Sequence, residues 1–398
     1  MTVLELTEHG TPLSVSLDDA VGRALARSRL VEAEPDTVLE GRWRVRAKGI
    51  VGVATVPVSG DDVITLRIAP KIPVARLLFL LGYSRGRRYW RPEHVQVDKD
   101  EELLPALARL FVLQADEAIR RGLLKGYRLF EDTALIMRGR VREAEQIRRH
   151  HGRLIPLEVA HDDYTADIAE NRLLRTASDV LLRLPGVTRD VRGQILRLRV
   201  RLAEITPIGR GASLPSWHPS RLNARYHKAL RLAELVLRAA SVEHRPGTVT
   251  VHGFLVDMAR VFEDFVTTAL GHALAKSGGY CALQASHHLD QDNAIRMVPD
   301  FVQYAIDGTP LAVADAKYKA EKPEGFPHAD LYQMLAYCTA LNLEHGHLVY
   351  AKGDAPHMSH RIRNSGITIH QHALDLDQAS ETLLADTSAL ARRLAAPL

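Results

Sequence analysis

The sequence predicts a mixed α/β protein of the α+β multidomain class, and three observations lead to this prediction. The chain has 398 residues, which is more than one ordinary hydrophobic core accommodates. Residues alternate between apolar and polar near the N-terminus, whereas helical spacing dominates the middle. Beyond the middle, helix and strand patterns follow one another, as in a mixed sheet flanked by helices. We therefore expect a β-rich domain over 1–130, a mostly helical region over 131–245 and a third domain over 246–398.

The N-terminal region contains two short segments of alternating character, 43–48 and 63–68, which predict half-buried strands. Residues 59–62, Ser-Gly-Asp-Asp, are typical of a turn between strands. A short helix is expected from residue 75, and a longer one over about 101–124, where leucines recur at helical spacing.

The middle region is predicted to contain helices over about 165–184 and 219–242, the second starting at a Pro-Ser pair suited to an N-cap. His244-Arg245-Pro246-Gly247 is the expected domain boundary, because it is polar and contains a Pro-Gly breaker.

The C-terminal region alternates between the two patterns. Residues 256–276 and 328–343 have the apolar spacing of helices, and three segments have the pattern of strands. The expected strands are 294–304, 311–319 and 347–351.

The composition is that of an ordinary globular protein, with 25% charged residues, 46% hydrophobic residues and a formal net charge of +4. The two cysteines, Cys281 and Cys338, are too few for a disulfide framework or a thiolate zinc site. No secretory signal and no apolar run of about 20 residues is visible, so we expect a cytoplasmic protein without a membrane partner.

Two predicted strands flank Asp307-Gly308, a pair favoured in two-residue type I′ hairpin turns. In that register Asp300 faces Asp315, and opposed residues have Cβ atoms about 4.5–5.5 Å apart. Two such carboxylates repel each other unless a cation lies between them. We expect Mg²⁺, or Mn²⁺ in its place, because hard cations prefer oxygen ligands.

Lys317 follows Asp315 by two residues and therefore projects from the same face of the strand. An ammonium beside the metal can orient or deprotonate a water molecule and neutralise charge that develops on a phosphate. Glu263, on the predicted helix before the sheet, is a candidate third metal ligand. An exposed helical glutamate is an equally good interpretation of it.

Gln333 and Tyr337 are neighbours on one face of the second helix, with Asp330 one turn earlier. They are candidates for binding DNA phosphates or orienting Lys317; a polar helix margin is the alternative. The pairs His287-His288 and His345/His347 lack the spacing of a zinc motif. The sequence contains no Gly-rich phosphate-binding loop, so we do not expect the chain to hydrolyse nucleotides by itself.

These residues together resemble the PD-(D/E)xK nuclease superfamily, in the branch with a Gln-x-x-x-Tyr helix. The wider sequence resembles the McrC family, the nuclease subunits of McrBC modification-dependent restriction systems. The matching segments lie along most of the chain: Pro70-Lys71-Ile72, Leu81-Gly82-Tyr83, Arg138-Gly139-Arg140, Asp167-x-x-x-Asn171-Arg172, Phe262-Glu263-x-Phe265, Pro299-Asp300, Ala314 to Lys319 and Asp330 to Tyr337.

The resemblance implies a C-terminal PD-(D/E)xK nuclease core over 246–398 that makes double-strand cuts in DNA. It also implies that the N-terminal region docks onto a hexameric AAA+ GTPase, McrB, and stimulates its GTP hydrolysis. The GTPase would recognise modified cytosine and drive translocation. Which N-terminal residues contact the GTPase is not assigned.

Two other functions remain open. A stand-alone recombination-type or CRISPR-associated nuclease has a similar helix, although such relatives often hold a cysteine-ligated iron–sulfur cluster, for which two cysteines do not suffice. A non-catalytic adaptor that activates an NTPase partner is the second. The complete set of Asp300, Asp315 and Lys317 argues against it, since a decayed site tends to lose a member.

Overall fold

A computed structural model describes the chain except for residues 1, 60–61, 85–101, 152, 241–251, 276–277, 321–327, 353–356 and 396–398. The chain forms two compact units, one made of Met1–Leu103 with Glu243–Leu398 and the other of Leu104–Val242. Residues 104–130, which we expected in the N-terminal domain, thus belong with the middle region. The boundary expected at residues 244–247 lies outside the described residues. No described helix is long and apolar enough to span a membrane.

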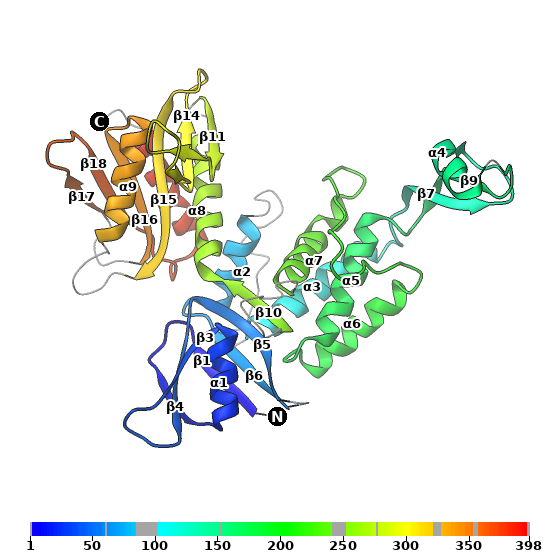
Figure 1. Ribbon diagram of the computed structural model, residues 1–398, viewed down its shortest axis with the longest axis horizontal. Coiled ribbons are helices and arrows are strands. Elements are labelled where there is room, and N and C mark those ends of the chain that lie inside the picture. The colour runs from blue at the N-terminus through cyan, green and yellow to red at the C-terminus, as the bar shows by residue number, and fades with distance from the viewer. Residues whose placement is uncertain are drawn as a thin grey trace. The chain divides into compact units, whose positions relative to one another are not determined.

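The N-terminal part of the first unit is β-rich, as predicted (Figure 1). A four-stranded sheet has the order β1-β6-β5-β10, and a three-stranded sheet has the order β2-β4-β3. One apolar core joins both sheets to helix α1, in which Gly22 leaves room for the ring of Trp43. The elements are β1 (Thr2–Thr7), β2 (Leu13–Ser16), α1 (Asp19–Ser28), β3 (Val31–Pro35), β4 (Arg42–Ala47), β5 (Ile50–Ser59), β6 (Asp62–Ala69), α2 (Val74–Tyr83) and β10 (His252–Asp257).

Strand β10 was not predicted from the sequence. It pairs antiparallel with β5, from His252 opposite Thr55 to Asp257 opposite Ile50, so a segment from beyond residue 250 completes the N-terminal sheet. Asp257 then caps helix α8 (Met258–Leu274) through hydrogen bonds from the backbone N–H groups of Ala259 and Arg260. The N-terminal sheet and the C-terminal part are thus joined within one unit.

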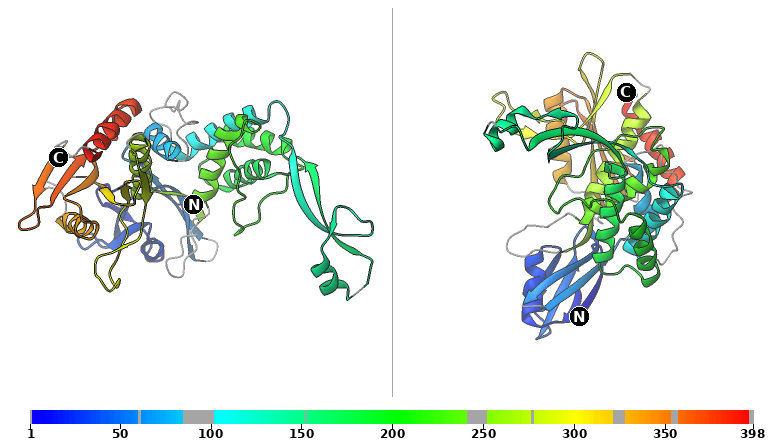
Figure 2. Two further views of the ribbon diagram at one scale, coloured as in Figure 1. Left: turned by 90° about the horizontal axis from the view of Figure 1, so that it is seen from above. Right: turned by 90° about the vertical axis from the view of Figure 1, so that its right-hand side faces the viewer.

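The C-terminal part is a mixed six-stranded sheet with the order β11-β14-β15-β16-β18-β17. Strands β15, β16 and β18 run parallel, and the outer pairings are antiparallel. Helix α9 covers one face, and α8 and α10 lie on the other (Figure 2). The elements are β11 (Tyr280–Leu283), β12 (His287–His288), β13 (Arg296–Met297), β14 (Phe301–Tyr304), β15 (Pro310–Ala320), α9 (His328–Leu341), β16 (His345–Lys352), β17 (His357–Arg361), β18 (Thr368–Ala373) and α10 (Ser380–Ala395).

Helix α9 packs closely on the sheet because Gly346 of β16 has no side chain. A Cβ atom there would lie 2.6 Å from both the Cys338 sulfur and a Met334 side-chain carbon. The apolar core on this side also contains Leu348 and Tyr350 of β16. This face of the sheet is therefore buried, and a charged residue on it needs a specific partner.

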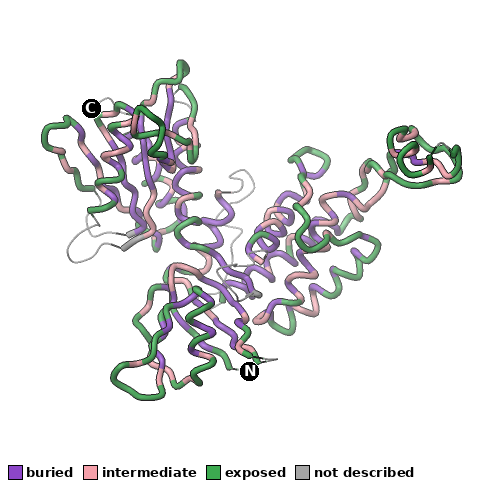
Figure 3. Tube along the Cα trace, viewed as in Figure 1, coloured by how far each residue is buried: buried purple, intermediate pink, exposed green. Residues whose placement is uncertain are grey.

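The second unit contains the expected helices, with shorter bounds than predicted, and a β arm that the sequence did not predict. In the arm, β9 pairs with β7 over nine residue pairs and with β8 over two. The tube in Figure 3 shows that the arm is largely exposed. The elements are α3 (Leu103–Ile119), β7 (Gly126–Ala134), β8 (Arg140–Val141), α4 (Glu143–His150), β9 (Leu157–Thr165), α5 (Ala169–Arg183), α6 (Arg189–Arg201), the 3-10 helix Ala224–Tyr226 and α7 (His227–Ala240).

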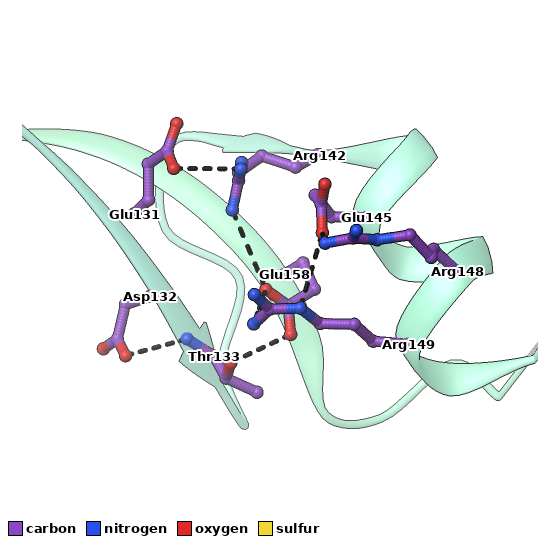
Figure 4. Close-up of a pocket in the computed structure, with 8 residues that line it drawn as sticks. All are labelled: Glu131, Asp132, Thr133, Arg142, Glu145, Arg148, Arg149 and Glu158. Atoms are coloured by element: carbon purple, nitrogen blue, oxygen red, sulfur yellow. Dashed lines mark hydrogen bonds and ion pairs between the residues drawn. The ribbon is translucent and has the colours of Figure 1, made fainter.

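The far end of the arm is held together by a buried glutamate, Glu158 of β9 (Figure 4). Its carboxylate lies 3.5 Å from the guanidinium of Arg149 and 3.0 Å from the ring of His150, both on α4. Thr133 of β7 donates a hydrogen bond to it over 2.9 Å. These contacts fix α4 against the hairpin, so the tip of the arm is an ordered structure rather than a loose loop.

Candidate functional site

The register predicted for the C-terminal hairpin is confirmed. Phe301 is paired with Ala314 and Val302 with Val313, which places Asp300 opposite Asp315. The predicted two-residue turn is wrong. The strands are joined by a longer loop in which Gly308 adopts a positive φ of 87°, and a bulge between Gln303 and Tyr304 restores the predicted register.

Asp300 and Asp315 lie on the part of the sheet that α9 covers. The backbone N–H of Ala316 donates a 2.8 Å hydrogen bond to Asp300 Oδ2, which fixes that carboxyl against the next strand. Asp315 is only 2% exposed, and the Lys317 ammonium forms an ion pair with its Oδ2. The acid–acid–lysine arrangement expected from the sequence is therefore present in the structure.

The electrostatics of the site follow from this crowding. Burial, and then the negative charges of Asp315 and Glu263, raise the pKa of Asp300 to about 8. Burial opposes the charge on Lys317, but the carboxylates of Asp315 and Asp300 outweigh it and raise its pKa. Near pH 7 the Lys317 side chain is thus charged, whereas the Asp300 carboxyl is largely protonated unless a further cation binds.

Glu263 lies on α8 and is partly buried, as predicted. Its carboxylate accepts a hydrogen bond from the Gln284 side-chain amide, a partner that no sequence motif predicts. Among the residues that the structure describes, no three His, Cys, Asp or Glu side chains form a group that could hold a metal ion. The structure does not assemble the predicted three-carboxylate set.

Asp300 and Asp315 alone nevertheless fit a magnesium site. Mg²⁺ commonly binds through one or two carboxylates, keeps several water molecules and takes further oxygens from substrate phosphates. A pair of opposed carboxylates, one buried and one half-buried with a strongly raised pKa, is the arrangement that such an ion stabilises.

Gln333 and Tyr337 are neighbours on α9, as predicted. The Gln333 amide donates a 2.7 Å hydrogen bond to the Tyr337 hydroxyl, which donates to the carbonyl of Val298 over 3.3 Å. Burial and the charges of Asp315 and Asp300 raise the pKa of Tyr337 to about 12. Tyr337 therefore lies near the carboxylates and fixes the segment just before Asp300, while Gln333 is exposed and accessible to a substrate.

Asp330, the third member of this helix face, is buried and accepts a hydrogen bond from the hydroxyl of Tyr350 over 3.2 Å. Its negative charge contributes to raising the pKa of Lys317. From helix α9 it therefore favours the charged form of Lys317.

The histidines His345 and His347 lie on the other face of the sheet. His345 Nδ1 is 3.1 Å from His370 Nε2, and His347 Nδ1 is 3.0 Å from His372 Nε2. The rings stack rather than converge on a point, and none belongs to a metal-binding group among the described side chains. The sequence could not reveal this stack, because it depends on how β16 and β18 are aligned.

Comparisons with known proteins agree with the sequence motifs. A family model described as McrBC 5-methylcytosine restriction system component matches residues 45–351. The fold is similar to a chain in a structure of Thermococcus gammatolerans McrB AAA+ hexamers with bound McrC, with a TM-score of 0.62 and 19% identity over 98% of this chain and 100% of that one. A chain of the Thermococcus gammatolerans McrBC complex matches more weakly, with a TM-score of 0.41 and 21% identity over 69% of this chain and 89% of that one. No curated protein sequence matches the chain.

Proposed function

The chain belongs to the McrBC 5-methylcytosine restriction system component family, and from this premise we propose that it is the subunit that hydrolyses DNA phosphodiester bonds. The observation that carries the proposal is the half-buried Asp300 opposite the buried Asp315, with the Lys317 ammonium paired with Asp315. In a PD-(D/E)xK nuclease core, these are the residues that hold Mg²⁺ and act on the phosphate.

Each residue of the site has a distinct task in this proposal. Asp300 and Asp315 bind the ion, which when present polarises a phosphate oxygen and a water molecule. Lys317 is held at the site by Asp315 and supplies positive charge where negative charge develops on the phosphate. Tyr337 holds the segment before Asp300 in place, and the exposed Gln333 amide has a second N–H, besides the one on Tyr337, to donate to a DNA phosphate.

The distribution of charge supports a polyanionic substrate. Residues 104–242 contain 25 Lys and Arg against 15 Asp and Glu, a net charge of +10, and 23 of those 25 are arginines. Residues 243–398, which hold the proposed centre, contain 12 basic and 18 acidic residues, a net charge of −6. Arginine binds phosphate through paired hydrogen bonds. We infer that the second unit supplies much of the attraction to DNA.

Partner binding is the second part of the proposal. We infer that the chain works with an AAA+ GTPase and stimulates its GTP hydrolysis, and that residues 1–130 contribute to the docking surface. The arm is a further candidate, because its tip exposes Leu135 by 74%, Ile136 by 75% and Leu154 by 82%. Exposed apolar groups of this size typically mark protein-binding surfaces.

The experiment compares cleavage of methylcytosine-containing and unmodified plasmid by the chain together with its GTPase partner, in Mg²⁺ or EDTA. We expect Mg²⁺- and GTP-dependent cuts in the modified plasmid, lost in Asp315→Asn and retained in Asp307→Asn. Asp307 is an exposed loop aspartate of the same hairpin and serves as the matched control. Full cleavage by Asp315→Asn would exclude the proposed centre.

The same experiment separates the two other functions. A stand-alone nuclease would cut DNA without the GTPase and without GTP. An adaptor would stimulate GTP hydrolysis but produce no cuts that depend on Asp315.

A further inference from the structure

Glu8, at the end of β1, is a buried carboxyl that the proposed reaction does not use. It is 0% exposed, and its Oε1 has no hydrogen-bond partner among the described residues. Its Oε2 accepts from the Tyr318 hydroxyl over 3.3 Å and from the backbone N–H of Lys71 over 3.4 Å. Burying a carboxyl with so few partners is costly, so the position requires an explanation beyond packing.

Tyr318 follows Lys317 directly and projects from the other face of β15. Its ring lies 6.0 Å from that of Phe262 on α8, and its hydroxyl reaches Glu8. Immediately after Lys317 the pairing of β15 with β16 becomes irregular, with a register shift before Ala320. Such bulges are common next to active sites, where they redirect a side chain. The hydrogen bonds between the two strands are interrupted there, so the backbone is held less firmly than in a regular strand.

The N-terminal sheet also anchors helix α8, which carries Glu263. Strand β10 is part of that sheet and leads directly into α8, where the backbone N–H of Met258 donates to the carbonyl of Gly49 over 2.9 Å. Glu263 lies on this helix, and its negative charge contributes to raising the pKa of Asp300. The helix is therefore anchored in the N-terminal sheet, and Glu8 offers the same anchorage to β15.

We propose that Glu8 is a positioning residue, which through the Tyr318 hydroxyl ties the bulge after Lys317 to the N-terminal sheet and so keeps the Lys317 ammonium on Asp315. This inference rests on the proposed function of Lys317.

The test uses Tyr318→Phe, which removes only the hydroxyl. Tyr304→Phe is the matched control, since it removes a hydroxyl that contacts His287 over 2.8 Å in the same sheet. We expect Tyr318→Phe to lower kcat for DNA cleavage about ten- to a hundredfold, the loss typical of a misplaced catalytic group. Its KM for DNA, its stimulation of the partner's GTP hydrolysis and its Tm should stay close to those of the control. Glu8→Gln retains an acceptor oxygen and should keep most of the activity.

A second measurement separates this inference from the proposed function. Hydrogen exchange of the amides from Lys317 to Ala320 should become faster in Tyr318→Phe and remain unchanged in Tyr304→Phe. If the wild type cuts no DNA, the proposed function fails, and the exchange data still decide whether Glu8 holds the bulge. Unchanged exchange, or a kcat for Tyr318→Phe equal to that of the control, would overturn the proposal.

Discussion

The second unit, here also called the middle unit (residues 104–242), and the C-terminal part (residues 243–398) differ in the sign of their net charge and in the burial of their charged groups. Residues 104–242 have a net charge of +10, and most of their arginines are at the surface, whereas residues 243–398 have a net charge of −6 and bury Asp315 and Asp330. A polyanion is attracted to the first region, and a cation to the second. Under the proposed function, we infer that the first region supplies the attraction to DNA and the second the chemistry on it.

The largest expected effect concerns the chemistry. Asp300→Asn removes a carboxylate opposite Asp315 but keeps an oxygen that accepts from the Ala316 N–H. We expect cleavage to fall by about 10²–10³, as for other groups that act on the transition state. Single-turnover plasmid cutting measures this. DNA affinity should stay within about twofold of the wild type, because we infer that residues 104–242 supply most of the attraction to DNA.

The same variant should gain stability when no divalent cation is present. The pKa of Asp300 is about 8 in the folded chain and near 3.8 when unfolded, so the folded state binds the proton more tightly. Stability therefore falls as pH rises from 4 to 8. Asp300→Asn removes this loss, and we expect a gain on the order of 1–3 kcal/mol at pH 8.5 in denaturant unfolding. An equal or lower stability would contradict the burial of an ionised Asp300.

A smaller effect should follow from removing charge in the middle unit. Arg189 and Arg197 are exposed on α6 and have no ion pair with a described residue. The double variant with glutamine at both positions should bind DNA about tenfold more weakly, and its salt dependence should fall by up to ~2 in the log–log slope. Arg361 and Arg363, exposed in the C-terminal part, provide the matched control. If both pairs weaken binding equally, the division between regions is wrong.

The smallest effect is an acid sensitivity of the C-terminal part. Burial, and then neighbouring histidines, lower the pKa of His347 well below its usual value and that of His372 to about 3. Below pH 6.5 these imidazoles are protonated in the unfolded chain but stay neutral in the folded chain. The free energy of unfolding therefore falls on acidification. At pH 6 we expect a loss below about 1 kcal/mol for each imidazole. Replacing both by leucine should flatten this dependence, whereas His288→Leu, at an exposed position, should not.

The sequence predicted the parts of the molecule that local patterns determine. Alternation identified β14 and β15, and the register that opposes Asp300 to Asp315 followed from pairing the strands about Asp307-Gly308. That register was right although the turn was not, because the longer loop and the bulge at Gln303 offset each other. The opposition of Asp300 and Asp315 could therefore be predicted without knowing the geometry of the loop.

What the sequence could not predict depends on contacts between distant segments. Strand β10 completes a sheet formed about 200 residues earlier, and the Glu8–Tyr318 contact joins residues 310 positions apart. The arm strands β7 and β9 expose the apolar residues Tyr127, Leu129 and Tyr164, so their pattern differs from that of a strand whose apolar face packs on a core. Glu263 is held by Gln284, a loop residue that no motif singles out.

Lys317→Ala tests the proposed nuclease centre most directly, when one preparation is assayed for plasmid cutting and for stimulation of the partner's GTP turnover. The substitution removes one ammonium from the C-terminal part and leaves the middle unit and the N-terminal sheet intact. We expect cutting to fall by about 10²–10³ while the stimulation of GTP turnover is unchanged. Persistent cutting, or a parallel loss of both activities, would contradict this expectation.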